Sequence, residues 1–327
     1  MKAILRLIRW QNLLLVVATM VLMRYSVIEP VLSKLGVVLT EGNEGFIPVT
    51  LKFPWYYFIF LVLATVLITA GGYVINDYFD IKTDLINKGE VIVGTKIPRR
   101  QAMMWHTILN IMGVGIGFFI SWKAGYFWMG TLFLIVSGLL YFYSSSYKRQ
   151  FLVGNLIVAL LVAMVPMLVA IFEWPALYRF YAVKAMSLPP ISVVFWWMGG
   201  FSLFAFLSTL IREIIKDIED FEGDMAYGRN TIPVVTGILT ARIITICMVI
   251  ITIALLYLAW YFFLHDRYTL IYISAAVTMP LLVTIYFLVF GKGTAQMHYA
   301  SRLMKVVMTT GILYSVLVKI MLTWNLI

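Results

Sequence analysis

The sequence predicts an all-α, polytopic membrane protein whose nine transmembrane helices surround a central cavity. Of its 327 residues, 62% are hydrophobic and 12% are charged, whereas a soluble domain is typically about half apolar and about a quarter charged. Nine mainly apolar runs are close to the roughly 20 residues that a helix needs to cross a bilayer. No stretch is of low complexity, so we expect residues 1–327 to form a single domain.

The expected spans follow the chain from end to end. The first comes after the basic segment 1–9. Its apolar run is too long for a secretory signal and no small-residue cleavage site follows it, so we expect a retained helix. The expected boundaries are 11–30, 54–76, 102–121, 126–146, 151–172, 194–214, 239–263, 268–290 and 305–323.

The basic residues indicate how the spans are oriented. With the N-terminus in the cytoplasm, the cytoplasmic segments hold 17 Lys and Arg and the external segments hold 7, as the positive-inside rule requires. We therefore expect an integral, multi-pass protein with a cytoplasmic N-terminus. The lack of a transit-like leader favours a prokaryotic inner membrane. The net charge of +10 fits this rule and anionic headgroups, so we expect no nucleic-acid partner.

Six of the seven aspartates form two matched triplets with the spacing D-x-x-D-x-x-x-D. Offsets of three and seven residues return to nearly the same direction on a helix, so each triplet is expected to form an acidic stripe. Like charges on one face repel one another unless a cation lies between them, and Mg²⁺ characteristically takes one or two carboxylates together with substrate phosphates. The stripes are Asp77, Asp80 and Asp84 after the second span, and Asp217, Asp220 and Asp224 after the sixth.

Both stripes are expected on the cytoplasmic side, where they can face each other across one cavity. Three interpretations of them are open: a marking of helix ends at the interface, a cation pathway of a transporter, and a diphosphate site bridged by Mg²⁺. A cation-coupled transporter would place carboxylates near the bilayer midplane in broken helices, whereas these follow the spans. The diphosphate site also explains the basic residues nearby. Cys247 is the only cysteine, which excludes a disulfide and a cysteine cluster.

Four motifs together indicate a family. Residues 76–84 read N-D-x-x-D-x-x-x-D and residues 217–224 read D-x-x-D-x-x-x-D. Residues 9–12 read R-W-Q-N and residues 143–148 read Y-S-S-S-Y-K. These motifs resemble the two aspartate signatures, the R-P-x-N element and the Y-S-x-x-L-K element of the UbiA superfamily of intramembrane prenyltransferases. The resemblance implies a Mg²⁺-dependent enzyme that transfers an isoprenyl group from a polyprenyl diphosphate to a lipophilic acceptor in the bilayer.

The second aspartate motif carries the information about the acceptor. Residues 212–224, followed by Gly228 and residues 231–233, are similar to the R-E-x-x-K-x-I-E-D-x-E-G-D pattern of the digeranylgeranylglyceryl phosphate synthases of that superfamily. The similarity implies a prenylated glycerol phosphate as acceptor and a role in ether-lipid synthesis. The segment after the first motif lacks the R-P that many members carry there. An aromatic acceptor, as in quinone biosynthesis, is therefore the alternative.

The resemblance also implies residue roles. It makes Asn76, Asp77, Asp80 and Asp84 the holders of one Mg²⁺ and Asp217, Asp220 and Asp224 the holders of another. Asp77 and Asp217 have the alternative role of orienting ligands or bonding basic groups. Residues expected in catalysis are Asp77, Asp80, Asp217, Lys148 and Tyr143. Residues expected to bind substrate are Asn12, Asn76, Lys88, Lys148, Arg212 and Lys216.

Each of these side chains also has a structural interpretation. Lys148 and Arg212 are expected on diphosphate oxygens and Lys216 on an acceptor phosphate, whereas positive-inside topology alone also explains basic residues here. Tyr143 is expected to stabilise the allylic cation, and the alternative is an interfacial belt tyrosine. Asn12 is expected in the acceptor pocket, and the alternative is a helix–helix hydrogen bond.

Two cytoplasmic segments are expected to close over the site. They comprise about residues 80–101 and 215–238. Closure would exclude water from a carbocation that water would otherwise quench. The alternative is that these segments are solvated loops that only set the topology. The sequence does not indicate an oligomeric state.

Overall fold

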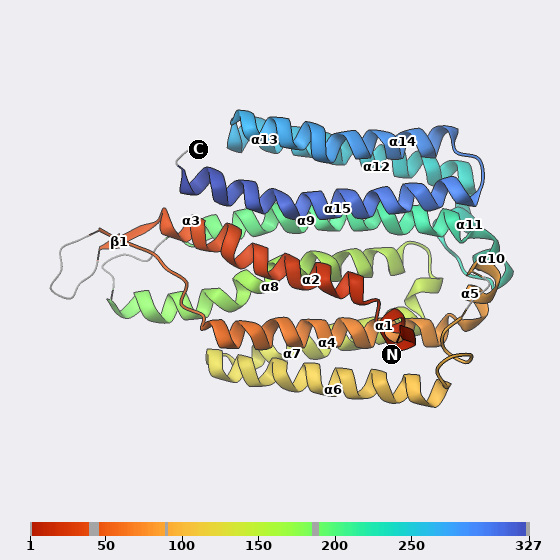
Figure 1. Ribbon diagram of the computed structural model, residues 1–327, viewed down its shortest axis with the longest axis horizontal. Helices are drawn as coiled ribbons and strands as arrows, with labels where there is room; N and C mark the ends of the chain where they lie inside the picture. The colour runs from red at the N-terminus through yellow and green to blue at the C-terminus, as the bar shows by residue number, and fades with distance from the viewer. Residues whose placement is uncertain (1, 39–45, 89–90, 185–189, 325–327) are drawn as a thin grey trace.

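The computed structural model describes residues 2–38, 46–88, 91–184 and 190–324. Within these ranges, nine helical segments are long and apolar enough to cross a membrane. They lie side by side in one elongated bundle (Figure 1), which confirms the predicted fold class and the number of spans. The segments are Trp10–Ser33, Trp55–Phe79, Arg99–Ala124, Phe127–Ser145, Val153–Ala182, Ser192–Glu219, Ile238–Leu264, Arg267–Phe290 and Thr294–Thr323.

Short helical turns divide several spans. The first span comprises α2 (Trp10–Leu22), the π-helical η1 (Met23–Ile28) and α3 (Glu29–Ser33). The seventh comprises α12 (Ile238–Ala259) and η4 (Trp260–Leu264), and the eighth comprises α13 (Arg267–Tyr272), η5 (Ile273–Thr278) and α14 (Met279–Phe290). The other spans are α4 (Trp55–Phe79), α6 (Arg99–Ala124), η2 (Phe127–Gly130) with α7 (Thr131–Ser145), α8 (Val153–Lys184), α9 (Ser192–Glu219) and α15 (Thr294–Thr323).

Some helices extend well past the apolar runs that predicted them. Helix α15 begins at Thr294 rather than at 305, because its polar first turns pack against the end of α9. There His298 Nδ1 lies 2.6 Å from Glu219 Oε1. Helix α9 also contacts α8 and α12. It therefore has neighbours on several sides, and its polar end contacts α15 through Glu219.

Both aspartate motifs bend the helix that carries them. Helix α4 ends at Phe79 and α5 (Ile81–Lys88) follows, with Asp80 between them at φ −90° and ψ 3°. Helix α9 ends at Glu219 and α10 (Phe221–Ala226) follows, with Asp220 at φ −90° and ψ 10°. The expected continuous stripe on one straight helix is therefore wrong for both motifs. Each triplet surrounds a bend at its central aspartate.

The bends bring the two aspartate motifs together. Helices α5 and α10 contact each other at one end of the bundle (Figure 1), and the backbone N–H of Gly223 donates to Asn87 Oδ1 at 3.1 Å. The segments expected as cap loops, about 80–101 and 215–238, are largely helical where the structure describes them. They hold α5, the end of α9, α10 and α11 (Ile232–Thr236).

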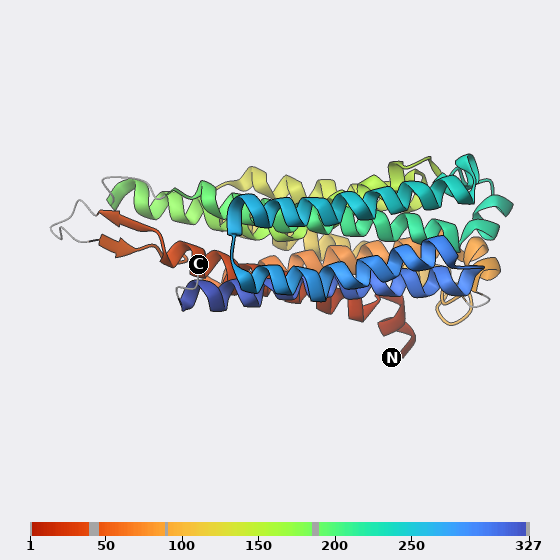
Figure 2. The ribbon, with the colours of Figure 1, turned by 90° about the horizontal axis from the view of Figure 1, so that it is seen from above.

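The opposite end of the bundle carries the antiparallel strands β1 (Gly36–Val38) and β2 (Phe46–Pro48) (Figures 1 and 2). A buried ion pair joins Arg24 of η1 to Glu173 of α8, with Nη1 and Oε2 3.5 Å apart. Glu173 also accepts the Phe53 N–H at 2.9 Å, and Arg24 donates to the Phe53 carbonyl oxygen. Arg24, which the positive-inside count treats as external, thus lies inside the bundle. It ties the first and fifth spans to the segment just before the second span.

Candidate active site

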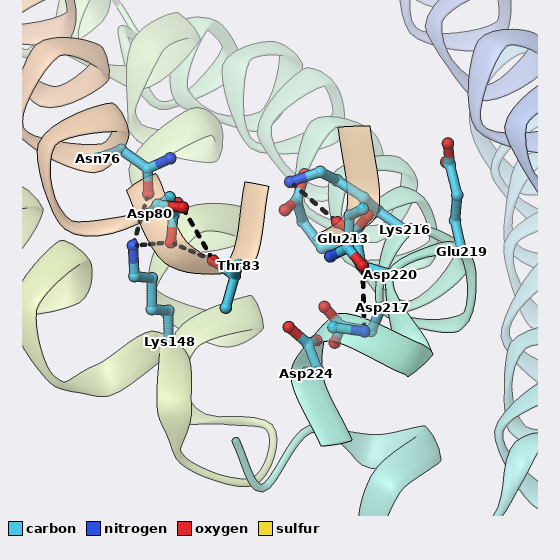
Figure 3. Close-up of polar contacts among 12 residues, drawn as sticks. Asn76, Asp80, Thr83, Lys148, Glu213, Lys216, Asp217, Glu219, Asp220 and Asp224 are labelled. Carbon is cyan, nitrogen blue, oxygen red and sulfur yellow. Dashed lines mark hydrogen bonds and ion pairs between the residues drawn. The ribbon is translucent and has the colours of Figure 1, made fainter. Parts of the chain in front are cut away.

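The two aspartate motifs face each other across a space at the end of the bundle (Figure 3). One side chain joins them directly. Arg229, between α10 and α11, has Nη2 2.5 Å from Asp80 Oδ1 and Nη1 3.3 Å from Asp224 Oδ1. Aspartates that are far apart in the sequence thereby share one guanidinium group. The tertiary fold makes a single polar site of the two motifs.

Asp80 is the centre of the first half of this site. Lys148 Nζ, in the 3₁₀ turn η3 (Tyr147–Arg149), lies 2.6 Å from Asp80 Oδ1 and 3.3 Å from Asn76 Oδ1. Burial raises the pKa of Asp80, but Lys148 and Arg229 outweigh it and hold that pKa well below its usual range. Burial lowers the pKa of Lys148 to about 8 against the pull of Asp80. The predicted residues Asn76, Asp80 and Lys148 are thus in mutual contact.

The second half of the site comes from α9 and α10. Asp217 Oδ2 accepts from Asn155 Nδ2 at 2.7 Å, and Lys216 Nζ lies 3.8 Å from Asp220 Oδ2. Asp224 is buried, and this burial raises its pKa to about 6 although Arg229 opposes the shift. Each carboxylate here has a polar partner: Asp217 has Asn155, Asp220 has Lys216 and Asp224 has Arg229 (Figure 3).

The first helix adds a third element. Arg9 lies between α1 (Lys2–Leu7) and α2 with a left-handed backbone at φ 50°, and its Nη2 is 2.9 Å from Asp77 Oδ1. Its guanidinium also covers the ring of Tyr73, 4.9 Å from the centroid, and Asn12 donates to the Tyr73 hydroxyl at 3.2 Å. Asp77 therefore bonds a basic group, as the alternative role for this residue requires.

A cavity of about 440 Å³ runs from this site into the bundle. Its polar end contains four of the predicted substrate-binding residues, Asn12, Asn76, Arg212 and Lys216, together with Tyr143. Its interior is mainly apolar and is lined by residues such as Val16, Met23, Ile68, Phe133, Leu168 and Ile312. This shape suits a molecule with a charged head and a long hydrocarbon tail.

The donor set fits a hard divalent cation. Within the described ranges, no three Asp, Glu, His or Cys side chains lie together as a ready metal site. Protein cations are instead paired with the carboxylates, as Arg229 is with Asp80 and Asp224. Carboxylate oxygens from two helices, with the amide oxygen of Asn76 nearby, are the ligands that Mg²⁺ takes. Asp84 lies in α5 beyond the bend.

Several site residues escaped the sequence analysis. Arg229 follows Asp224 by five positions, but in the sequence it is only one of the 17 basic residues that the positive-inside rule explains. Asn155 and Tyr73 lie inside apolar spans, where no local pattern links them to Asp217 or Asn12. Their contacts could be found only from the packing of helices. The side chain of Lys88, expected to bind substrate, lies outside the described part of the chain.

A family model described as the UbiA prenyltransferase family matches residues 46–306. The chain belongs to this family. Similar proteins include the digeranylgeranylglyceryl phosphate synthase of Methanosphaera stadtmanae, 29% identical over 247 residues that cover 75% of this chain and 81% of the relative. The synthase of the same name from Methanobrevibacter smithii is 32% identical over 222 residues, which cover 67% and 72%.

Solved structures share the UbiA fold. A digeranylgeranylglyceryl phosphate synthase matches with a TM-score of 0.60 at 22% identity over 96% of this chain and 98% of that one. A UbiA homologue from Aeropyrum pernix K1 matches with a TM-score of 0.63 at 14% identity over 92% and 98%. A homologue from Archaeoglobus fulgidus bound to DMAPP and Mg²⁺ gives 0.53 at 16% identity over 96% and 98%.

Family membership confirms three predictions. The chain is a UbiA-type prenyltransferase, its fold is the multi-helix membrane fold of that family, and it is an integral, multi-pass membrane protein. The aspartate motifs that carried the resemblance are the same residues that form the polar site at the end of the cavity. The family motifs and the cluster of polar side chains therefore lie at the same end of the bundle.

Proposed function

We propose that this UbiA prenyltransferase joins an isoprenyl group from a polyprenyl diphosphate to the hydroxyl of a prenylated glycerol phosphate, giving an ether lipid. The observation that carries this proposal is the cavity. Its mouth holds the basic residues Arg9, Arg212, Lys216 and Lys305, and its interior is apolar. This lining suits amphiphilic substrates with anionic heads, and the relatives are named for a product of this class.

The diphosphate head of the donor belongs at the paired aspartate motifs. Asn76, Asp80 and Asp84 on one side and Asp217, Asp220 and Asp224 on the other would hold Mg²⁺, with Asp77 and Asp217 serving also to orient their neighbours. When bound, Mg²⁺ supplies positive charge to the oxygens of the departing diphosphate. Lys148 and Arg229 contact Asp80. In this proposal they also donate charge-assisted hydrogen bonds to the diphosphate oxygens.

The reaction is a substitution at the allylic C1 of the donor. The bond between C1 and the diphosphate oxygen breaks, and its electron pair leaves with diphosphate. The acceptor hydroxyl oxygen bonds to C1, and its proton passes to a carboxylate of the site. Tyr143 lines the cavity beside this site, where its ring can stabilise the developing cation. The apolar walls exclude water that would capture it.

The site faces the cytoplasm of a prokaryotic inner membrane in this proposal. The support is the excess of Lys and Arg in segments on the motif side, 17 against 7. Helices α5, α10 and α11 lie at this end of the bundle (Figure 1).

The acceptor class is tested by product mass. Purified protein in neutral-lipid nanodiscs receives geranylgeranyl diphosphate, Mg²⁺ and either geranylgeranylglyceryl phosphate, dihydroxynaphthoate or 4-hydroxybenzoate. We expect an ether product and diphosphate release only with the glycerol phosphate. Both should disappear when a chelator removes Mg²⁺ and return when it is restored. A prenylated aromatic product would overturn the acceptor, and an ether product formed in excess chelator would overturn the metal requirement.

A further inference from the structure

Lys305 stands out among the four basic residues at the cavity mouth. Arg9 is paired with Asp77, Arg212 with Glu213, and Lys216 with Asp220. Within the described ranges, no acceptor lies within hydrogen-bond or ion-pair distance of the Lys305 ammonium group. Its side chain is exposed and lines the cavity, so the ammonium group is open to an anionic ligand there.

A second unsatisfied donor lies at the same place. The Nε–H of Arg212 is buried and has no hydrogen-bond partner among the described residues, although the same guanidinium pairs with Glu213 through Nη1. A buried donor without an acceptor is destabilising. Both Arg212 and Lys305 line the cavity, so one anion in the cavity would lie beside two cationic groups.

The helix geometry places these two residues at equal depth. Helices α9 and α15 run antiparallel and contact each other (Figure 1), and Glu219 and His298 touch at 2.6 Å. Arg212 lies seven residues before Glu219, and Lys305 lies seven residues after His298. Seven residues restore the same helix face and correspond to about 10 Å of rise. The faces that meet at Glu219 and His298 therefore also bring Arg212 and Lys305 to one level of the cavity.

We propose that Arg212 and Lys305 form a binding site for the phosphate monoester of the acceptor lipid. This inference rests on the proposed function and adds the residues that select a phosphorylated acceptor. The site is distinct from the diphosphate site, because Lys148 and Arg229, which contact Asp80, do not line the cavity. The donor head is held at the aspartates, and the acceptor head is held deeper on α9 and α15.

The test compares acceptors that differ only in the phosphate. Wild type, Lys305→Gln and Lys305→Arg are assayed with geranylgeranylglyceryl phosphate and with geranylgeranylglycerol in phosphatidylcholine nanodiscs. We expect Lys305→Gln to raise the KM for the phosphorylated acceptor about tenfold or more, since a charge-assisted hydrogen bond is lost. The KM for the donor and the KM for the unphosphorylated acceptor should stay within about twofold of the wild-type values. Lys305→Arg should restore most of the affinity.

The control is Arg302→Gln, which removes the same charge one turn away on α15 from a residue that does not line the cavity. It should leave every KM unchanged. An equal rise in KM for both acceptors in Lys305→Gln would overturn the proposal. A loss seen only when anionic phospholipids are added would assign Lys305 to bulk headgroups and would also overturn it.

Direct binding separates this inference from the proposed function. Affinity for geranylgeranylglyceryl phosphate is measured without donor, by intrinsic fluorescence of wild type and Lys305→Gln. A loss of about tenfold or more in the variant supports the phosphate site even if no ether product forms, in which case the proposed reaction alone falls. Equal affinity of the two proteins refutes the phosphate site whatever the activity.

Discussion

Asp80→Asn is expected to lower kcat on the order of a thousandfold, because it removes the charge at the centre of the site. Removing a single preorganised electrostatic contact at a reacting centre costs roughly 10²- to 10³-fold, and Asp80 is both a candidate metal ligand and the partner of Lys148 and Arg229. The asparagine keeps the size of the side chain and one acceptor oxygen. Single-turnover diphosphate release at saturating donor measures the effect.

The matched control is Asp266→Asn at the other end of the protein. Asp266 is the seventh aspartate, and its Oδ1 accepts the N–H of Thr269 at 2.6 Å as the cap of α13. Asparagine is an equally good cap, so stability and kcat should both stay near the wild-type values. Retention of near-normal kcat in Asp80→Asn at saturating Mg²⁺ would contradict the assignment of Asp80.

Arg229→Gln is expected to lower kcat/KM for the donor about a hundredfold. Arg229 pairs with Asp80 and Asp224, and in the proposed reaction it lies where the charge of the leaving diphosphate develops. Arg229→Lys should recover little, because an ammonium group cannot reach Asp80 and Asp224 with two nitrogens as the planar guanidinium does. Steady-state kinetics at varied donor concentration measure this effect.

A nearby exposed arginine provides the control for Arg229. Arg149 follows the buried Lys148, yet its own side chain is exposed. Arg149→Gln removes the same charge from the same face of the protein, so a purely topological or surface role would give both variants the same phenotype. Similar kcat/KM values for Arg149→Gln and Arg229→Gln would refute the role of Arg229 as a link between the motifs.

The sequence predicts the spans well because apolar runs of membrane length have few alternative structures. The helix ends are harder to predict. The first turns of α15 are polar, and their helical state depends on packing against α9. The bends at Asp80 and Asp220 were missed because the three-and-seven spacing assumes a straight helix, whereas the tertiary structure breaks both helices at the central aspartate.

The residues of the candidate site also fall into those that the sequence predicts and those that only the tertiary structure reveals. Asn76, Asp80 and Lys148 carry recognisable motif letters, and the structure brings them together. Arg229 and Lys305 carry only a positive charge, which topology alone explains in a membrane protein. Only the structure distinguishes them from other basic residues. Arg229 pairs with aspartates of both motifs, whereas Lys305 has no ion-pair partner among the described residues. The pair Arg24 and Glu173 likewise has no signal in the sequence, because one residue lies in η1 and the other in α8.

The most direct test of the central claim is the coupling between the two motifs in binding the donor. Affinity for geranylgeranyl thiolodiphosphate, a poorly reactive donor analogue, is measured with and without Mg²⁺ for wild type, Asp80→Asn, Asp224→Asn and the double variant. One shared diphosphate site predicts Mg²⁺-dependent binding. The double variant should then bind the analogue only slightly less tightly than the single variant with the lower affinity. The claim of one shared site would be contradicted if the binding free energies lost in the two single variants added in full in the double variant. Affinity that did not depend on Mg²⁺ would also contradict it.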